Sequence, residues 1–436
     1  MSAGLGMDLD RRQFHALGLG SLFGAAPQNN SKVLRFGWWG GAGRHEVTLK
    51  AIALFEQQNP GVKIKAEYMG FNGYLERLTT QIAGGSEADI VQINWAWLAM
   101  FSKRGNGFTD LDPFRSLLAL DQFSAEDLAS GRVQGKLNAL PTAYTARVML
   151  WNQATFDRAG VPLPKTWDDL FAAGPLFKSR LGDMAYPLDG ELYDMILLSQ
   201  AYVHQKYGTP YVDPLQARVA MSEEAVYEWV QTYQRLVQNH VATSLSLRTS
   251  MGGAEKPTEQ QPEWVVGNWA GNFTWDSVIP LRAGTLNKEQ KLVLGDFPTL
   301  PGSKVSGMFG RPTMMLAIGR NCKHPELAVR FMNFLLTDPQ AAAILGKTRG
   351  VPAARLPLEI LVQGQRLPPM ELAAHQQINA QRIAGRIPVP APLFEHARLH
   401  KFMREVFETI AYGKTSPRDA ARRLIDDGNA LLKRIK

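Results

Sequence analysis

The chain has 436 residues, of which 45% are hydrophobic and 20% are charged, and its formal net charge is +8. This length exceeds one ordinary hydrophobic core, so two domains are expected. The charge is moderate and no dense Lys/Arg run precedes the C-terminal helices, which argues against bulk nucleic-acid binding but leaves acidic small ligands open. The single cysteine, Cys322, excludes an intrachain disulfide, and no Cys/His spacing indicates a metal site.

Residues 1–30 read as an export signal and a short tail. Arg11 and Arg12 precede Phe14 and an apolar segment rich in glycine and alanine, a pattern that resembles a twin-arginine export signal. The segment is too short for a permanent membrane-spanning helix. Asp8 and Asp10 beside the arginines favour the alternative, an unstructured tail. Because no cysteine lies near the apolar segment, we expect an exported protein without a lipid anchor.

The chain from Val33 to Asn59 predicts a strand, a glycine loop and a helix. Apolar residues alternate with others over residues 33–38, at the period of two that a strand requires. Glycines in 40–43 break the strand, and helical apolar spacing follows. Such units bind ligands beyond the carboxyl end of the strand, where anions also meet the helix N-terminus. The residues at this position predict a site for a flat, polar, anionic ligand: Trp38, Trp39, Arg44 and His45.

Two further strands are expected at residues 62–68 and 89–93, with a helix from Tyr74 to Ala83 between them. This β-α-β-α-β order with short connections predicts a parallel sheet covered on both faces. Each strand ends in a loop with aromatic and amide side chains, and three such loops at one sheet edge predict a binding rim. The last two loops contribute Asn72, Asn94, Trp95 and Trp97.

The rest of the chain mixes helices with short strands. Two helical pieces are expected over 152–180, with Thr166 as the N-cap of the second piece. The stretch from Trp264 to Trp275 predicts a strand that runs into an aromatic turn rich in asparagine and glycine. Further expected elements are helices over 189–240, strands at 292–297 and 313–318, a helix at 325–336 and a mostly helical C-terminal part.

The chain contains, in this order, FEQQNPGVKIKAEY, TTQIAGGSEADIVQ, LPTAYTARVMLWNQATF, VPLPKTWDDL, GNWAGNFTWDS, FPTLPG and HPELAVRFMNFLLTDPQAAAILGKTRGVPA. Together these motifs resemble the carbohydrate-specific extracellular solute-binding proteins of ABC importers, in the maltose-binding-like class. WWGGAGRHEVTLKA, TTQIAGG and FGRPTMMLAI are more similar to binding proteins for oligogalacturonides, which derive from pectin. The resemblance implies an α/β fold of type II, with two lobes, three crossing segments and the ligand in the cleft between the lobes.

The same resemblance implies where the lobes lie and how they work. The first lobe would comprise residues 33–142 plus 312–348, and the second 146–308 plus 352–436. The crossings would fall near Pro141–Thr145, Gly307–Pro312 and Gly350–Val351. The implied protein is a periplasmic monomer that closes on an oligosaccharide and delivers it to permease subunits in the membrane. Closure would follow because the ligand contacts both lobes only when they are near each other.

The candidate ligand-binding side chains combine aromatic rings, arginines and amides. Sugar rings place an apolar C–H face on aromatic platforms, while their hydroxyls meet amides and carboxylates. Consecutive strand residues point to opposite faces, so one tryptophan of each pair is expected to serve the core. Ion pairs and turns are the alternative roles for the arginines and asparagines. The candidates are Trp38, Trp39, Arg44, His45, Asn72, Asn94, Trp95, Arg147, Trp269, Asn272, Trp275 and Arg311.

Three of these candidates are arginines placed at strand ends or hinges that are expected to face one cleft: Arg44, Arg147 and Arg311. Buried guanidinium groups without partners are costly to desolvate. A carboxylate from the ligand would satisfy them through charge-assisted hydrogen bonds. The sequence therefore predicts an acidic oligosaccharide that contains uronic acid.

The alternative function is a polysaccharide-active enzyme, such as a glycosidase or a lyase. A glycosidase needs two carboxylates about 5–9 Å apart across a cleft. The available carboxylates have other plausible uses, since Asp89 opens a strand, Glu46 starts a helix and Asp276 can cap one; Asp189 and Glu191 are the remaining two. No nucleophile-elbow, zinc-protease or phosphate-loop motif occurs. We therefore expect a binding protein that is not an enzyme and that needs no cofactor.

Overall fold

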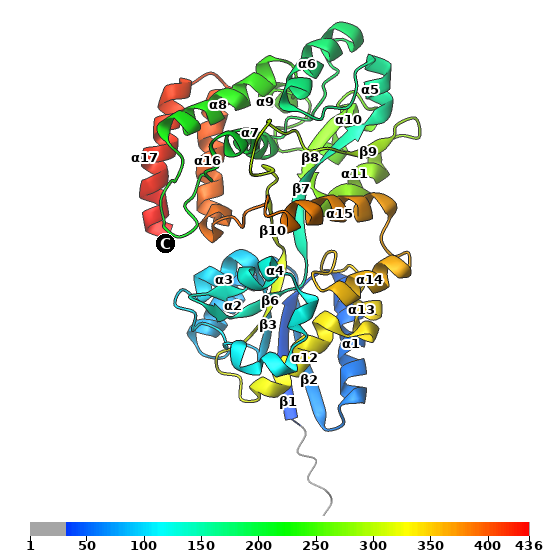
Figure 1. Ribbon diagram of the computed structural model, residues 1–436, viewed down its shortest axis with the longest axis vertical. Coiled ribbons are helices and arrows are strands. Elements are labelled where there is room, and N and C mark those ends of the chain that lie inside the picture. The colour runs from blue at the N-terminus through cyan, green and yellow to red at the C-terminus, as the bar shows by residue number, and fades with distance from the viewer. Residues whose placement is uncertain (1–31, 436) are drawn as a thin grey trace, which may run out of the picture.

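The computed structural model describes residues 32–435, which form two α/β lobes stacked one above the other (Figure 1). The predicted export signal lies outside the described residues. Within residues 32–435, no helix is both long enough and apolar enough to cross a membrane.

The first lobe, at the bottom of Figure 1, is built on a five-stranded sheet. The strands of this sheet are β1 (Lys32–Trp39), β2 (Val62–Met69), β3 (Ile90–Asn94), β6 (Ala139–Pro141) and β11 (Met314–Ile318). The short strands β4 (Arg132–Val133) and β5 (Lys136–Leu137) pair with each other in a separate two-stranded sheet. Its helices are α1 (Ala42–Gln58), α2 (Tyr74–Ala83), α3 (Trp95–Phe101), η1 (Asp112–Leu117), η2 (Leu120–Gln122), α4 (Ala125–Ser130), α12 (Pro325–Thr337), α13 (Pro339–Leu345) and α14 (Arg355–Gln363).

The sheet has the order β2-β1-β3-β11-β6. β1 pairs in parallel with β2 and β3, as predicted, whereas β11 runs antiparallel to β3 and β6. On one face of the sheet, Phe36 packs edge-on against Phe331 of α12, with the ring centroids 5.6 Å apart. Because β1 and β3 are parallel neighbours, their carboxyl ends meet at one edge of the sheet, as the predicted binding rim requires.

The predicted loops after β1 and β3 are shorter than expected, because helices begin almost at once. α1 starts at Ala42, inside the predicted glycine loop. α3 starts at Trp95, because the side chain of Asn94 accepts a hydrogen bond from the backbone of Ala96 at 3.1 Å and caps the helix. Trp95 and Trp97 therefore lie on the first turn of a helix and not on a loop.

The second lobe carries the second sheet and most of the helices. Its strands are β7 (Tyr144–Asn152), β8 (Gly271–Trp275), β9 (Leu292–Gly295) and β10 (Gly310–Pro312). Its helices are α5 (Gln153–Ala159), α6 (Trp167–Leu181), α7 (Leu192–Tyr207), α8 (Glu223–Gln238), α9 (Leu245–Ser250), η3 (Thr258–Gln260), α10 (Pro262–Val265), η4 (Asp276–Val278), α11 (Ile279–Thr285), α15 (Pro369–Ile383), η5 (Pro392–Glu395), α16 (Ala397–Ala411) and α17 (Pro417–Ile435).

β7 is the central strand of this sheet, and all nine of its residues are buried. The predicted cap at Thr166 is confirmed, since its hydroxyl accepts a hydrogen bond from the Asp169 backbone at 3.1 Å. The predicted order of strand and turn within 264–275 is wrong. Pro262 opens the short helix α10, and Gly267 turns the chain at φ +81°, so the aromatic run itself forms β8.

Two of the three crossings lie where expected. The chain leaves β6 for β7 at residues 141–144 and returns from β10 to β11 at 312–314. The segment at 347–352 passes beside the first crossing, where Gly350 has φ +102°. A Cβ at Gly350 would lie 2.8 Å from that of Ala143, so the close approach requires glycine.

The third crossing, which returns the chain to the second lobe, comes later than residue 352, the predicted boundary. α14 packs on α12 and α13 of the first lobe, with Pro357 and Leu361 buried. α15 is the first helix after the crossing to pack against β9 and α11 of the second lobe. The passage between the lobes therefore lies between α14 and α15 (Figure 1).

Candidate ligand-binding cleft

A cavity of about 260 Å³ opens between the lobes beside the crossing segments. It is lined by Thr313, Lys347, Gly350 and Val351 next to the first lobe and by Tyr144, Thr145, Asp276, Ser277, Pro280 and Glu371 of the second. The Lys347 ammonium and the Glu371 carboxylate form an ion pair of 2.7 Å, which closes one side of the cavity. Burial raises the pKa of Asp276 to about 6, although a hydrogen bond from Thr145 opposes the shift.

The second lobe directs one face of its sheet toward this cavity. Thr145 and Arg147 are two residues apart on β7, so they share a face of the strand. Thr145 pairs with Arg311 of β10, and Arg147 pairs with Trp275 of β8. Three predicted site residues, Arg147, Trp275 and Arg311, are thereby brought together next to the cavity.

Both of these arginines already have carboxylate partners in the protein. Arg147 forms a buried ion pair with Asp194 of α7. The Nε of Arg311 lies 2.7 Å from Oε2 of Glu395 in η5. Arg147 and Arg311 are therefore not unpaired guanidinium groups that require a ligand carboxylate.

Trp275 is the half-buried aromatic ring between these groups. The guanidinium carbons of Arg147 and Arg311 lie 5.0 and 4.9 Å from the centroid of its ring. Phe309 packs edge-on against the same ring at 5.7 Å. These contacts fix the orientation of the ring, which suits an aromatic platform.

Arg44 is the predicted site arginine of the first lobe. Its Nε donates to the carbonyl of Thr348 at 3.0 Å, and its Nη1 donates to the carbonyl of Trp39 at 2.9 Å and contacts the sulfur of Met314. A Cβ on Gly40 would lie 2.6 Å from Cδ and 2.9 Å from Cβ of Arg44. The glycine after β1 thus allows the arginine to fold back over the end of the strand.

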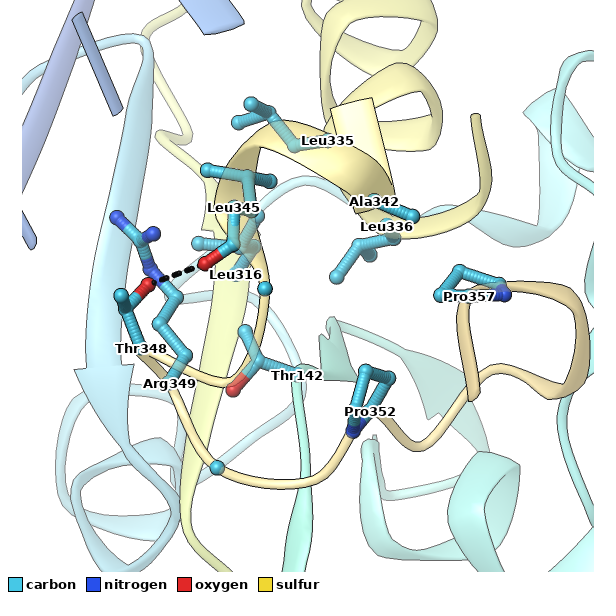
Figure 2. Close-up of a pocket in the computed structure, with 12 residues that line it drawn as sticks. Thr142, Leu316, Leu335, Leu336, Ala342, Leu345, Thr348, Arg349, Pro352 and Pro357 are labelled. Carbon is cyan, nitrogen blue, oxygen red and sulfur yellow. Dashed lines mark hydrogen bonds between the residues drawn. The ribbon is translucent and has the colours of Figure 1, made fainter. Parts of the chain in front are cut away.

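Arg349 joins Arg44 from the segment after α13. Its Nε donates to the side chain of Gln92 at 2.8 Å, and its Nη2 donates to the hydroxyl of Thr48 at 3.0 Å. Figure 2 shows its guanidinium pointing away from the small apolar cavity that Leu335, Leu336 and Leu345 line. Arg349 is not among the predicted site residues, although its position next to the predicted third crossing at Gly350–Val351 was a signal that could have identified it.

Neither arginine has an anionic partner. Within residues 32–435, no carboxylate lies within ion-pair distance of Arg44 or Arg349. Burial lowers the pKa of Arg44, and burial together with the positive charge of Arg44 lowers the pKa of Arg349 to about 9. Two cations without a carboxylate partner thus lie near the end of β1 and the positive N-terminal end of α1, an arrangement that favours an anion.

An aromatic cluster continues the first-lobe wall. The ring of Trp39 packs against Tyr74 at 5.0 Å, Trp97 at 5.2 Å and Phe71 at 5.7 Å. Trp97 is half-buried, and Phe71, which the prediction omitted, is 56% exposed. α3, which carries Trp97, packs against η5 of the second lobe, so this cluster and Glu395 flank the same interlobe boundary.

His45 and Trp38 form a separate stack. Trp38 is fully buried against Tyr68 at 4.9 Å, and its Nε1 donates to Nδ1 of His45 at 3.1 Å. Neutral His45 therefore carries its proton on Nε2. Burial, followed by the charges of Arg44 and Arg349, lowers the pKa of His45 and favours this neutral form.

The other predicted residues lie apart from the cavity wall. Trp95 and Trp269 are buried in the cores, and buried Asn272 accepts a hydrogen bond from Nε of Arg282 at 2.8 Å. Asn94 caps α3, and Asn72 lies exposed before α2. Core packing accounts for Trp95 and helix capping accounts for Asn94, whereas Nε1 of Trp269 and Nδ2 of Asn272 are buried without a hydrogen-bond partner among the described residues. In the described part of the chain, no cluster of three or more His, Cys, Asp or Glu could hold a metal ion.

The model of the family described as bacterial extracellular solute-binding protein matches residues 41–342. The chain belongs to this family. The family match confirms the resemblance seen in the sequence and, with it, the two-lobed α/β fold of a solute-binding protein.

Solved structures resemble this solute-binding protein along nearly its whole length. A periplasmic oligogalacturonide-binding protein from Yersinia enterocolitica is 38% identical, with a TM-score of 0.85, over 92% of this chain and 99% of that one. The same protein in complex with saturated digalacturonic acid gives a TM-score of 0.78 over the same shares. A de novo designed cysteine esterase is 37% identical, with a TM-score of 0.89, over 93% of this chain and 100% of that one.

Sequence relatives match over shorter stretches. The diacetylchitobiose-binding protein DasA of Streptomyces coelicolor is 24% identical over 302 residues, which span 66% of this chain and 65% of DasA. A Brucella abortus relative is 32% identical over 130 residues, or 30% of this chain, and the chain spans about a third of that relative's length, 31%.

Proposed function

We propose that this protein is the substrate-binding component of an ABC importer and that it holds an acidic, uronate-containing oligosaccharide between its lobes. The similarity to an oligogalacturonide-binding protein at 38% identity supports this ligand class. The protein would be exported to the periplasm, act as a monomer and pass its ligand to permease subunits in the membrane. The predicted export signal and the family support this location.

The observation that carries the proposal is the pair of guanidinium groups without carboxylate partners, Arg44 and Arg349. In the described part of the chain, Nη2 of Arg44 and Nη1 of Arg349 take part in no hydrogen bond, so each retains a donor for a ligand. A charge-assisted hydrogen bond contributes about 1.5–3 kcal/mol, more than a neutral one. A neutral sugar would leave both buried cations uncompensated.

The two lobes supply complementary parts of a sugar site. Trp275 on the second lobe offers an aromatic face for the C–H side of a pyranose ring. Trp97 and Phe71 offer partly exposed rings on the first lobe. Because the guanidinium donors lie on the first lobe and the ring of Trp275 lies on the second, a ligand that contacts both lobes stabilises the closed arrangement over an open one.

The enzyme alternative has little support among the carboxylates that the sequence offered. Asp189 is buried in an ion pair with Arg248, and Glu46 pairs with Lys50 on the surface of α1. Asp89 accepts a hydrogen bond from the backbone of Arg35 at 2.8 Å. Asp276 lines the cavity together with Glu371, but the Glu371 carboxylate is held in an ion pair with Lys347 at 2.7 Å, so it is not a free partner for the two-carboxylate chemistry of a glycosidase.

A thermal-shift screen tests the proposal. A ligand at about 100 times its Kd stabilises the folded state by about 2.7 kcal/mol, because it binds only that state. Digalacturonate and trigalacturonate should raise the Tm, whereas neutral oligosaccharides of the maltose and xylose types should not. Stabilisation by neutral oligosaccharides alone would refute the acidic ligand, and stabilisation by no oligosaccharide would refute a sugar-binding function.

A further inference from the structure

We propose that the cleft recognises one carboxylate of its ligand, on the first lobe, and that Glu395 reserves the second-lobe subsite for an uncharged part of the sugar. This inference rests on the proposed function and specifies its ligand further. It follows from the distribution of charge between the two walls of the cleft.

The second-lobe wall has no net positive charge to offer, and Asp276, which lines the cavity, adds a further carboxyl. Its two arginines, Arg147 and Arg311, are matched by two carboxylates, Asp194 and Glu395. The side chains of Arg311 and Glu395 are 15% and 11% exposed, so both members of this pair keep some surface that a ligand can reach. The pair of Arg147 and Asp194 is more deeply buried and is out of reach.

Glu395 is held in place from several directions. Its Oε2 lies 2.7 Å from Nε of Arg311, and its Oε1 lies 3.9 Å from Nε2 of His400. His400 is itself fixed by the hydroxyl of Tyr193 at 2.6 Å. The turn η5 that carries Glu395 packs against α3 of the first lobe, so the carboxylate lies where the two lobes meet.

The pair of Arg311 and Glu395 should bind a ligand hydroxyl better than a ligand carboxylate. A ligand carboxylate approaching Arg311 would come close to the carboxylate of Glu395, and like charges repel. A hydroxyl can accept from a guanidinium and donate to a carboxylate, so it suits both members of the pair. The nearby ring of Trp275 can cover the C–H face of the same sugar residue.

The first-lobe wall has the opposite character. Arg44 and Arg349 bring two positive charges that no protein carboxylate compensates within residues 32–435. The ligand carboxylate therefore binds there, and the residue on Trp275 needs no charge. The fitting ligands are galacturonides with one free uronate, including those whose other residue carries a methyl ester, as well as fully de-esterified ones.

Calorimetry with four forms of digalacturonate tests this directly: the free acid, each of the two monomethyl esters and the dimethyl ester. One monoester should bind within about threefold of the free acid, and the other monoester and the diester should bind at least about tenfold more weakly. Equal tenfold losses for both monoesters would overturn the inference while leaving an acidic ligand in place. Equal binding of all four forms, or of none, would refute the proposed function itself.

The variant Glu395→Gln provides the second arm, because it keeps the shape and removes the charge. With Arg311 no longer neutralised, the free acid should bind at least about fivefold more tightly than the monoester that the natural protein tolerates. Glu359→Gln is the matched control, since Glu359 is an exposed carboxylate on α14, 3.3 Å from Arg355. This control should leave the ratio of the two affinities, for the free acid and for the tolerated monoester, unchanged. If Glu395→Gln has the same ratio of affinities for these two ligands as the natural protein, the role of Glu395 is overturned.

Discussion

Arg382 and Asp127 form a buried ion pair that joins the two lobes, with Nη2 of the arginine 2.6 Å from Oδ1 of the aspartate. Asp127 belongs to α4 of the first lobe, and Arg382 belongs to α15 of the second. The Arg382 guanidinium also lies 3.8 Å from the ring centroid of Tyr144, in the first crossing segment. The lobes are therefore tied together beside a crossing, where a hinge movement displaces them least.

Replacing Asp127 with Ala should destabilise the protein strongly. The change leaves the guanidinium of Arg382 buried without its partner, and breaking a buried pair in this way costs about 3–5 kcal/mol. Urea denaturation measures the loss of unfolding free energy. Arg355→Ala is the control, because the exposed pair of Arg355 and Glu359 should contribute about 0–1 kcal/mol. A loss for Asp127→Ala as small as that of the control would show that this contact contributes little.

Replacing Arg44 with Lys should weaken digalacturonate binding by about tenfold, which corresponds to about 1.4 kcal/mol. Lysine keeps the charge but loses the planar fork that a carboxylate needs for two parallel hydrogen bonds. Arg77→Lys is the control, because Arg77 lies exposed on α2, 3.4 Å from Glu67. Calorimetry should show an unchanged affinity for this control. Unchanged affinity for Arg44→Lys would remove Arg44 from the site.

Gly40 should affect digalacturonate binding because it leaves room for the side chain of Arg44. A methyl group at Gly40 would meet Cβ and Cδ of Arg44, so Gly40→Ala must displace that side chain. The variant should lose digalacturonate affinity while keeping the far-ultraviolet circular dichroism of the natural protein. Gly43→Ala is the control on the same helix end, because nothing lies within 4 Å of a Cβ there. Equal affinities for the two glycine variants would contradict the placement of Arg44.

The buried carboxyl of Asp276 predicts a pH dependence of stability. Its pKa is raised from 3.8 to about 6, so between these values the folded state holds a proton that the unfolded state has released. The contribution of this group to stability therefore falls as the pH rises from about 4 to about 6, by up to about 3 kcal/mol. Asp276→Asn should gain stability relative to the natural protein over this window, as measured by urea denaturation at each pH. A difference that stays constant with pH would contradict the raised pKa.

Much of the first lobe was predictable because its signals are local. The alternation in β1, the glycines after it and the capped helix α2 depend on residues that are close in sequence, and the predicted bounds agree with the structure within a few residues. The lobe membership of α14 was not predictable in this way. It depends on packing against α12 and α13, which only the folded chain brings together.

For the candidate site, the sequence indicated which types of residue to expect, but it did not indicate which partners those residues have in the folded protein. Arg44 contacts Met314 of β11, and Arg311 lies over the ring of Trp275 and pairs with Glu395, but the binding roles of these three residues stay predictions. The partners Asp194 and Glu395 come from distant helices, and no local pattern links them to Arg147 or Arg311. Alternation places Trp38 and Trp39 on opposite faces of β1, yet both are buried, so the expectation of one core tryptophan in this pair is wrong; Trp269, which precedes β8, is buried as well.

Closure of the lobes should be visible in solution. Small-angle scattering with saturating digalacturonate should give a smaller radius of gyration than without ligand, because a ligand held by both lobes favours the closed arrangement. A neutral disaccharide at the same concentration serves as the control. An unchanged radius at saturation would contradict hinge closure and would leave the binding itself intact.

The most direct test of the acidic-ligand account is calorimetric titration with digalacturonate and with its neutral counterpart, α-1,4-linked digalactose, which differs only in having hydroxymethyl groups in place of the carboxylates. Because the cations of Arg44 and Arg349 have no carboxylate partner in residues 32–435, digalacturonate should bind at least about a hundredfold more tightly, or about 2.7 kcal/mol. Binding of digalactose with equal or greater affinity would contradict the account.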